Sequence, residues 1–523
     1  FYLMLLLKVI QMQITPMPQM YMVTNYEYMS IGKLTWKCET TAQQNCMQQV
    51  QTMKELYEKD FFPKGEPIAQ IGAYTKIETL TITVKTIESP KSVFVGIENY
   101  TIETNKSGIF ISAENLYGIS RGLASVAQLI VEKPGNEFVP NYYHIQSVKI
   151  TDFPIYKYRS LMIDTARHFL SMTTIKRQIN AMALSKLNAL HIHIIDSQSS
   201  AFVPSTAPAN DFQKSSYNNG GYYSMYKQEL TEIARYADSL GVHLVIEFDM
   251  PGHVKAWRLA NPAIIANCPT HQYSTVDPTN DLTYQYIKTY MSDLVDAAFT
   301  SVNKDPVLHL GGDEVDHRCW SEDKKIQKYM DDNHLTTNTL WQQFHSKIIA
   351  MVNEMNSKTT RLYWQESYEN NNDMSGNAIV HAWYDYSIAS KAVQQGYKVV
   401  RSQGWYLDVN QPGDSRYSFG DTWQDFYQID PVKGIDSQYR NLIIGGGACM
   451  WGEKVSNGNI DDFIWPRTLA VAEALWYAPI DRSITNNLKE RMQEAVCRYL
   501  NVGVASGPIK PSKPCPGMDE PRY

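Results

Sequence analysis

The sequence predicts a closed (β/α)8 barrel, the TIM fold, preceded by a smaller α+β domain. Beyond about residue 150, short apolar runs alternate with longer segments whose apolar residues recur every three or four positions. No GxGxxG motif follows the first of these runs, which disfavours an open doubly wound sheet. We expect a truncated signal peptide over residues 1–14, an α+β domain over 15–152, and the barrel with a C-terminal helix and tail over 153–523.

The first domain is expected to be an antiparallel sheet with helices. Strand-like runs occupy residues 76–87 and 108–113, and a helical pattern runs through 118–133. Residues 151–159 form the expected crossing into the barrel.

Eight strand candidates follow, each a short apolar run between polar or glycine-containing segments. They cover residues 160–165, 189–196, 242–249, 306–313, 361–366, 378–383, 397–403 and 441–452. Helical segments lie between them, one after a candidate cap at Thr173 and another ending at Gly241. Such a series of βα units favours a closed barrel.

Charge and composition exclude several classes of partner. The formal net charge of -6 comes from 54 acidic and 48 basic residues, too balanced for a nucleic-acid-binding surface. The opening run FYLMLLLKVI resembles part of a signal peptide, and no other stretch is apolar for long enough to span a bilayer. Asn99 and Asn105 begin Asn-x-Ser/Thr triplets, which accept glycans if the chain is secreted.

The seven cysteines form no CxxC pair and no Cys/His cluster with zinc spacing, so a metal site is disfavoured. The expected disulfides are Cys38–Cys46, Cys497–Cys515 and, if two separate loops meet, Cys268–Cys319. Cys449 is then left as a buried thiol. This pairing indicates an oxidising compartment.

Carboxylates and indoles dominate the predicted carboxyl ends of the barrel strands, where a barrel gathers its chemistry. In chain order these ends carry Asp164, Arg167 and His168; Asp196; Glu247, Asp249 and His253; Asp313 and Glu314; Trp364 and Glu366; Trp383; Trp405, Tyr406 and Asp408; Trp451 and Glu453. A polar residue at one strand end can simply mark the exit from the core. Its recurrence at every end, beside large aromatic rings, suits a pocket for sugars, which have apolar ring faces and hydroxyl edges.

Asp313 and Glu314, within the stretch HLGGDEVDHRCW, are the central pair. Like charges resist simultaneous ionisation, so this arrangement favours one proton-bearing acid and one anion. Adjacent residues cannot flank a glycosidic bond as acid and nucleophile, because those groups lie roughly 5 to 9 Å apart across it. If Glu314 is the acid, the reaction therefore needs a nucleophile other than Asp313.

Several motifs resemble those of the family-20 β-N-acetylhexosaminidases, in order and spacing. They are RSLMIDTARHF, LNALHIHIIDSQS, EFDMPGH, HLGGDEV, WYLD and ACMWGE. The resemblance runs from about residue 15 over nearly the whole chain and is closest to the eukaryotic lysosomal or secreted enzymes. It implies an exo-acting, retaining glycoside hydrolase that needs no cofactor. Its substrate's own 2-acetamido oxygen attacks the anomeric carbon to give an oxazolinium ion, a known exception to the two-carboxylate scheme.

The same resemblance implies roles for single residues. Glu314 is the general acid and then the base, Asp313 orients and stabilises the acetamide, and Tyr406 donates to the acetamide oxygen. The other residues expected to contact or support substrate are Trp364, Trp383 and Trp451, walling the acetamide and ring; Arg167, Asp408 and Glu453, holding the hydroxyls at O3, O4 and O6; Asp196 and His253, relaying protons to Glu314; and Trp405 beside them.

Three positions depart from the family pattern. Ser197 stands where relatives often have a second Asp, and Gly447 stands where they often have Glu. Val409 follows Asp408, whereas the subunit type that accepts anionic sugars resembles Asn-Arg there. We therefore expect a preference for neutral terminal GlcNAc or GalNAc over sulfated or sialylated sugars. The resemblance also implies a homodimer, secreted or lysosomal.

Two other functions remain open from the sequence. A metal-dependent barrel hydrolase could use His191 and His193, which point to the same side of one strand, but His309 and His381 carry no accompanying ligand motif. A satisfied pair of core histidines is the simpler interpretation. A non-catalytic sugar-binding barrel is the second alternative, and the intact pair of acids argues against it.

Overall fold

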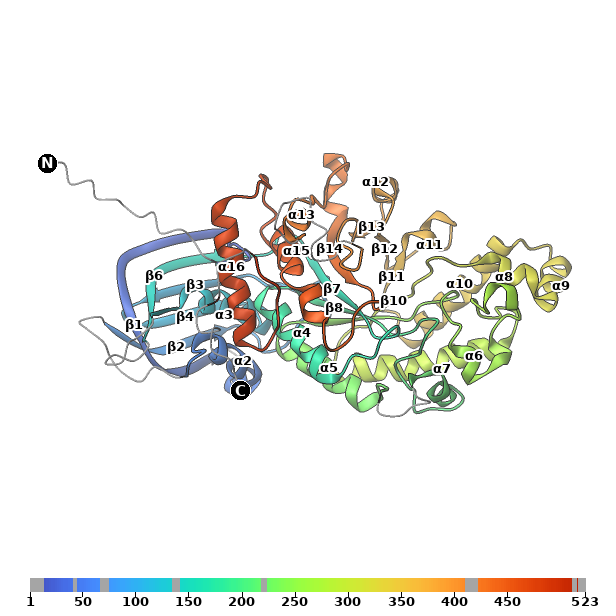
Figure 1. Ribbon diagram of the computed structural model, residues 1–523, viewed down its shortest axis with the longest axis horizontal. Coiled ribbons are helices and arrows are strands. Elements are labelled where there is room, and N and C mark those ends of the chain that lie inside the picture. Colours follow the sequence, from blue (N-terminus) through green and yellow to red (C-terminus); the bar gives the residue numbers. More distant parts are fainter. Residues whose placement is uncertain are drawn as a thin grey trace.

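The computed structural model describes residues 14–40, 45–65, 75–133, 142–217, 223–409, 422–509 and 515. The predicted signal segment lies outside these residues except for Ile14, as does the C-terminal tail beyond residue 509 except for Cys515. Figure 1 shows a sheet with helices at one end of the molecule and a helix-wrapped barrel at the other.

The predicted barrel is confirmed: eight parallel strands close in sequence order. The last strand pairs with the first, in register from Gly445 with Tyr158 to Met450 with Ile163. The strands are β7 (Tyr158–Asp164), β8 (Ala189–His193), β9 (His243–Glu247), β10 (Val307–His309), β11 (Thr360–Trp364), β12 (Ala378–Ala382), β13 (Lys398–Arg401) and β14 (Ile443–Met450). Most end before the polar residues that the sequence pattern included, so those residues lie in the βα loops.

Helices follow the strands around the outside of the barrel (Figure 1). They are α4 (Met172–Leu184), α5 (Lys227–Ser239), α6 (Trp257–Ala260), α7 (Asp281–Ala298), α8 (His317–Glu322), α9 (Lys324–Asp332), α10 (Thr337–Met355), α11 (Gln365–Glu369), α12 (Tyr386–Gln394), α13 (Trp423–Tyr427), α14 (Ile460–Ile464), α15 (Arg467–Trp476) and α16 (Asn486–Asn501). The expected cap at Thr173 is wrong, because the hydroxyl of Ser171 accepts the Thr174 N–H at 3.2 Å and starts α4 earlier. The end of α5 before Gly241 is confirmed.

The N-terminal domain holds a six-stranded sheet in the order β1-β2-β4-β3-β6-β5, with β1 also pairing with β6. Its strands are β1 (Met20–Thr40), β2 (Lys76–Val84), β3 (Tyr100–Asn105), β4 (Gly108–Ala113), β5 (Val131–Lys133) and β6 (Tyr142–Asp152). The sheet is mixed and not antiparallel throughout, since β2 runs parallel to both β1 and β4.

The helices of this domain also differ from expectation. The predicted helix ends early: α3 covers Leu116–Leu129, the β-branched Ile130 is extended, and β5 begins at the β-branched Val131. Two further helices, α1 (Cys46–Gln49) and α2 (Gln51–Phe61), were not predicted, although Met53, Leu56, Tyr57 and Phe61 of α2 recur at helical spacing.

A buried ion cluster joins the two domains. Glu98 accepts from Arg121 of α3 at 2.7 Å and from Arg159 of β7 at 2.6 Å. Burial alone would raise the pKa of Glu98, but the two guanidinium groups lower it to about 2. The C-terminal helix α16 adds a second tie, because Arg498 lies 3.3 Å from Asp60 of α2.

Candidate functional site

The two acids lie in the loop after β10, and the glycines before them are required by a close approach. A Cβ atom on Gly311, at φ 59°, would lie only 1.6 Å from Asp249 Oδ1. The same carboxylate oxygen accepts the Gly312 N–H at 2.9 Å, and Gly312 has φ 87°. Asp249 thus anchors the loop from below, and only glycine fits both the space and the left-handed backbone.

Asp313 and Glu314 point into different environments. Asp313 is 6% exposed, whereas the side chain of Glu314 is 64% exposed. Glu314 itself has φ 50°, a left-handed conformation that costs free energy in a non-glycine residue. Burial first, and then the neighbouring Asp249 carboxylate, raise the pKa of Asp313 well above its usual value. The pair therefore divides into one enclosed carboxyl and one solvent-facing carboxyl.

His253 connects these carboxyl groups. Its Nδ1 lies 2.7 Å from Asp249 Oδ2 and 3.8 Å from Asp313 Oδ1, while its Nε2 lies 3.5 Å from Glu314 Oε2. Burial opposes a charge on the ring, but the acids around it raise the pKa of His253 well above its usual value. The hydrogen bond with His253 lowers the pKa of Glu314. The imidazolium of His253 is therefore the group that carries a proton next to Glu314.

The structure gives His253 a different partner from the predicted one. Asp196 lies 2.6 Å from Arg167 Nη2 and 3.0 Å from His193 Nε2, so it supports the arginine. Asp249, a strand-end residue for which no role was predicted, takes the position beside His253 because both lie in the loop that follows β9.

Four aromatic rings form a box above the barrel. Tyr406 stacks on Trp383 with ring centroids 5.6 Å apart, and Trp364 lies 6.0 Å from Trp451 and 6.5 Å, edge to face, from Trp383. Trp364 is 1% exposed, so it forms the floor, while the other three are half-buried walls. Together with Met162 and Cys449 they make an apolar cluster separate from the main core. The predicted burial of the Cys449 thiol is confirmed.

Trp405 does not join this box. It is fully buried and its indole N–H donates to the Phe426 carbonyl at 3.0 Å. Because successive residues of an extended segment point to opposite sides, Tyr406 faces the box and Trp405 faces the core. Its inclusion among the substrate-contacting residues is wrong.

Charged groups surround the mouth of the box. Arg167 lies over the Trp451 ring, with Cζ 4.9 Å from the centroid, and its Nε is 3.9 Å from Glu453 Oε1. Burial raises the pKa of Asp408 to about 6, and the nearby Glu453 adds to the shift. A cation and two acids within this small area can hold several hydroxyl groups of one sugar ring.

One residue of the site, Glu366, had no assigned role. Its Oε2 accepts the Trp383 indole N–H at 3.0 Å, and the neighbouring Gln365 Oε1 accepts the Trp383 backbone N–H at 2.9 Å. The only signal in the sequence was its place at a strand exit, two residues after Trp364.

The barrel interior below Trp364 holds a buried carboxylate among histidines. Glu247 Oε1 accepts the Trp364 indole N–H at 2.7 Å, and Oε2 lies 2.8 Å from His191 Nε2 and 3.1 Å from His193 Nδ1. Burial opposes its charge, but the surrounding donors, His193 foremost, lower the pKa of Glu247 well below its usual value. Both histidines of the metal alternative therefore lie within ion-pair distance of a protein carboxylate.

Three groups of described residues nevertheless bring ligand atoms close enough together to hold a cation: His191, Glu247 and His309; His193, Asp196 and Asp249; and Asp249, His253 and Asp313. In the first group the centroid of the Trp364 ring lies 4.6 Å from that of His309 and 6.2 Å from that of His191. In the other two, Arg167 and His253 already supply positive charge to the acids.

The departures from the family pattern have structural explanations at two positions. A Cβ atom on Gly447 would lie 1.8 Å from Ser160 Oγ, so the serine of β7 occupies the space of any side chain there. Val409 is 64% exposed beside Asp408 and brings no charge to that edge.

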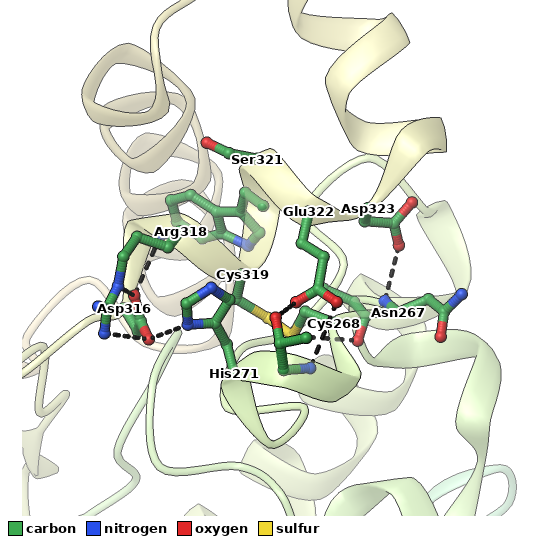
Figure 2. Close-up of a disulfide and its surroundings, with 12 residues drawn as sticks. Asn267, Cys268, His271, Asp316, Arg318, Cys319, Ser321, Glu322 and Asp323 are labelled. Carbon is green, nitrogen blue, oxygen red and sulfur yellow. Dashed lines mark hydrogen bonds and ion pairs between the residues drawn. A yellow bond between two sulfur atoms is a disulfide. The ribbon is translucent and has the colours of Figure 1, made fainter.

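A disulfide ties down the loop that carries the acids. Cys268 and Cys319 are bonded, with Cα atoms 5.0 Å apart, as predicted. Figure 2 shows polar contacts on both sides of it: Asp316 meets His271 at 3.0 Å, and Asp323 accepts the Asn267 N–H at 2.7 Å. The disulfide and these hydrogen bonds therefore connect the loop after β9 to the loop after β10.

The remaining cysteines and acceptor sites lie away from the box. Cys38 pairs with Cys46 and Cys497 with Cys515, also as predicted. Asn99 is exposed, and Asn105 is half-buried at the end of β3. Among the described residues, no helix is both long and apolar enough to cross a membrane.

Comparison with known proteins agrees with this geometry. Residues 156–479 match the catalytic domain of glycosyl hydrolase family 20. The chain is 31% identical over 475 residues to β-hexosaminidase subunit A1 of Dictyostelium discoideum, covering 89% of this chain and 85% of that one. It is 29% identical over 455 residues to the human β-hexosaminidase subunit beta, covering 84% and 78%.

Solved structures show the same fold. The chitobiase of Flavobacterium johnsoniae superposes with a TM-score of 0.76 at 24% identity, covering 94% of this chain and 73% of that one. The β-N-acetylhexosaminidase of Streptomyces coelicolor gives 0.72 at 21% identity, covering 96% and 98%. The chain therefore belongs to glycosyl hydrolase family 20 and is a glycoside hydrolase of the eukaryotic β-hexosaminidase type.

Proposed function

We propose that this chain is an exo-acting, retaining β-N-acetylhexosaminidase that removes terminal, non-reducing β-linked GlcNAc or GalNAc from oligosaccharides and glycoconjugates. The observation that carries the proposal is the pairing of one solvent-facing carboxyl, Glu314, with one enclosed carboxyl, Asp313, beside a box of aromatic rings. Two adjacent residues of one loop cannot reach a glycosidic bond from opposite faces, so we infer that the nucleophile comes from the substrate.

In the proposed reaction, Glu314 donates a proton to the glycosidic oxygen while the acetamide carbonyl oxygen attacks the anomeric carbon. The aglycone leaves with that proton, and an oxazolinium ion remains. Glu314, now a carboxylate, takes a proton from a water molecule, which attacks the same carbon and reopens the ring. Two displacements at one carbon retain its configuration.

Asp313 accepts the acetamide N–H and stabilises the positive charge that develops on it. Burial and Asp249 favour its protonated form in the free site. The donor and the developing cation favour the anion once substrate is bound, so stabilisation is strongest in the transition state. Tyr406, stacked on Trp383, is placed to donate to the acetamide oxygen.

His253 serves as the proton store for Glu314 in this scheme. Its raised pKa keeps a proton 3.5 Å from the Glu314 carboxyl, and Asp249 holds the ring in position from the other nitrogen. Substrate binding shields Glu314 from water and raises its proton affinity, so the proton moves to the acid when it is needed.

Sugar hydroxyls are assigned to the charged groups at the mouth of the box. Arg167, Asp408 and Glu453 hold O3, O4 and O6 and close the pocket behind the non-reducing end. Because Val409 adds no cation there, neutral terminal sugars are preferred over sulfated or sialylated ones.

The test is hydrolysis of a chromogenic β-GlcNAc substrate by the wild type and by Glu314→Gln. We expect turnover by the wild type and a rate close to background for the variant; a variant that keeps most of the wild-type rate would remove Glu314 as the acid. A thiazoline that mimics the oxazoline should inhibit strongly, and no inhibition at high concentration would count against substrate assistance.

Two assays separate this function from its alternatives. Activity that survives a strong chelator removes the metal-dependent hydrolase, for which the His191, Glu247 and His309 group is the structural argument. Turnover itself removes a purely sugar-binding role.

We also propose that the chain works in the secretory pathway or lysosome as a homodimer. The three disulfides suit an oxidising compartment. Glycosidase-sensitive mass on Asn99 or Asn105, and a dimer mass in solution by light scattering, are the expected results.

A further inference from the structure

The exits of β11 and β12 are joined through one side chain. Glu366, at the start of α11, accepts the indole N–H of Trp383 at 3.0 Å, while Gln365 fixes the backbone of the same tryptophan at 2.9 Å. Trp383 in turn stacks on Tyr406 at 5.6 Å. One wall of the aromatic box is therefore oriented by a carboxyl group that itself lies outside the box.

The surroundings of Glu366 are rich in acids. Burial, the larger effect, and the nearby Glu369 and Glu314 raise its pKa to about 7. Glu366 also contributes to the raised pKa of Asp313. Glu369 is exposed and bonded to the Tyr384 hydroxyl at 2.9 Å, so it is a neighbour on the same helix that does not hold Trp383.

We propose that Glu366 is a positioning residue of the proposed acetamide pocket, holding the Trp383 indole in place more firmly when it is ionised than when it is protonated. This inference rests on the proposed function for its meaning in catalysis. Its physical basis is the strength of the acceptor: an N–H donates a stronger hydrogen bond to a carboxylate than to a neutral carboxyl.

Trp364 provides an internal comparison. Its indole N–H also donates to a carboxyl oxygen, Glu247 Oε1, at 2.7 Å, compared with 3.0 Å for the bond from Trp383 to Glu366. Glu247, however, has its pKa held well below the usual value by the histidines around it, so it stays ionised throughout the neutral range. The two indoles therefore differ in whether their acceptor changes charge near neutral pH.

The direct test is the pH dependence of the indole N–H resonances in protein labelled with ¹⁵N-tryptophan. Trp383→Phe and Trp364→Phe assign the two signals. We expect the Trp383 signal to titrate with a midpoint near pH 7 and the Trp364 signal to stay flat between pH 5.5 and 8.5. Glu366→Gln should abolish the titration, whereas Glu369→Gln should keep it, with a midpoint below the wild-type value because one of the nearby acids that raise the pKa of Glu366 has been removed. A flat Trp383 signal, or one that still titrates in Glu366→Gln, would overturn the inference.

Kinetics add a readout of positioning. Glu366→Gln keeps an acceptor for the indole, so KM and thiazoline affinity should stay within about threefold of wild type; Glu366→Leu loses it, and KM should rise about tenfold. Equal effects of the two variants would overturn the positioning role. If the Trp383 signal titrates in a chain that hydrolyses no β-GlcNAc substrate, the proposed function fails and the positioning role of Glu366 stands. If the chain hydrolyses the substrate but the Trp383 signal does not titrate, the proposed function stands and the positioning role fails.

Discussion

Two enclosed carboxylates of the barrel, Glu247 in its interior and Asp313 in the loop after β10, have opposite electrostatic surroundings. Glu247 is 0% exposed and Asp313 is 6% exposed. Burial pushes both toward the neutral form, yet their pKa values move in opposite directions: well below the usual value for Glu247 and well above it for Asp313. Histidine and indole donors surround the first, whereas other acids surround the second. Neighbouring donors, not depth, decide the ionisation.

The difference separates the stability of the barrel from its chemistry. The interior charge is matched by partners and holds Trp364 in place. The rim keeps acids close together without enough cations, an arrangement that costs stability and is found where protons are transferred. Changing the two regions should therefore have different consequences.

The largest effect is expected on activity at the rim. Asp313→Asn keeps the shape of the side chain but removes the anion that stabilises the oxazolinium charge, so kcat should fall about 10³-fold, or about 4 kcal/mol. The thermal midpoint should stay or rise, because an acid that resists ionisation has been replaced. Steady-state kinetics measure kcat, and calorimetry measures the thermal midpoint. A large loss of stability without a loss of kcat would contradict the assignment of chemistry to the rim and stability to the interior.

The next effect is expected on stability in the interior. Glu247→Gln leaves the surrounding histidines without their anion, and breaking such a buried group should cost about 3 kcal/mol in the free energy of unfolding. Urea unfolding measures it, with exposed Glu369→Gln as the matched control. Unchanged stability would mean that the interior charge is dispensable.

The loop that carries the acids should respond to loss of its disulfide. Replacing Cys268 and Cys319 together by serine should lower the free energy of unfolding by about 2 kcal/mol. Because the tie holds the loops after β9 and β10 together, kcat should fall as well. Removing the distant Cys38–Cys46 bond is the control, and an equal loss of kcat there would argue against a role specific to this loop.

The smallest effect is on the pH dependence of stability. The pKa values of Glu366 and Asp408, about 7 and about 6, lie above those of an unfolded chain. Their contribution to stability is fully present below the unfolded pKa values of about 4 and is lost progressively as pH rises to the folded values. Thermal midpoints of the protein should thus decline between about pH 4 and 7, and less so in Glu366→Gln/Asp408→Asn. Parallel curves for the two proteins would contradict the assignment.

The sequence predicted the barrel because its apolar runs recur regularly, and it predicted the acids because strand ends meet at one face of such a barrel. It could not show which carboxylate lies beside His253, since Asp196 and Asp249 both follow strand ends. The paths of the loops that carry them determine which one reaches the imidazole ring. Trp405 was misassigned because adjacent aromatic residues look alike until the backbone direction is known. The mixed N-terminal sheet depends on long-range pairing of β1, which no local pattern reports.

The central claim is that the substrate's acetamide is the nucleophile stabilised by Asp313. Rates of hydrolysis should be measured for aryl β-glycosides carrying acetyl, monofluoroacetyl, difluoroacetyl and trifluoroacetyl groups on the 2-amino nitrogen. Fluorine withdraws electrons from the carbonyl oxygen, so kcat/KM should fall steadily along the series, by about tenfold or more in total. A rate that does not depend on the number of fluorine atoms would contradict participation of the acetamide.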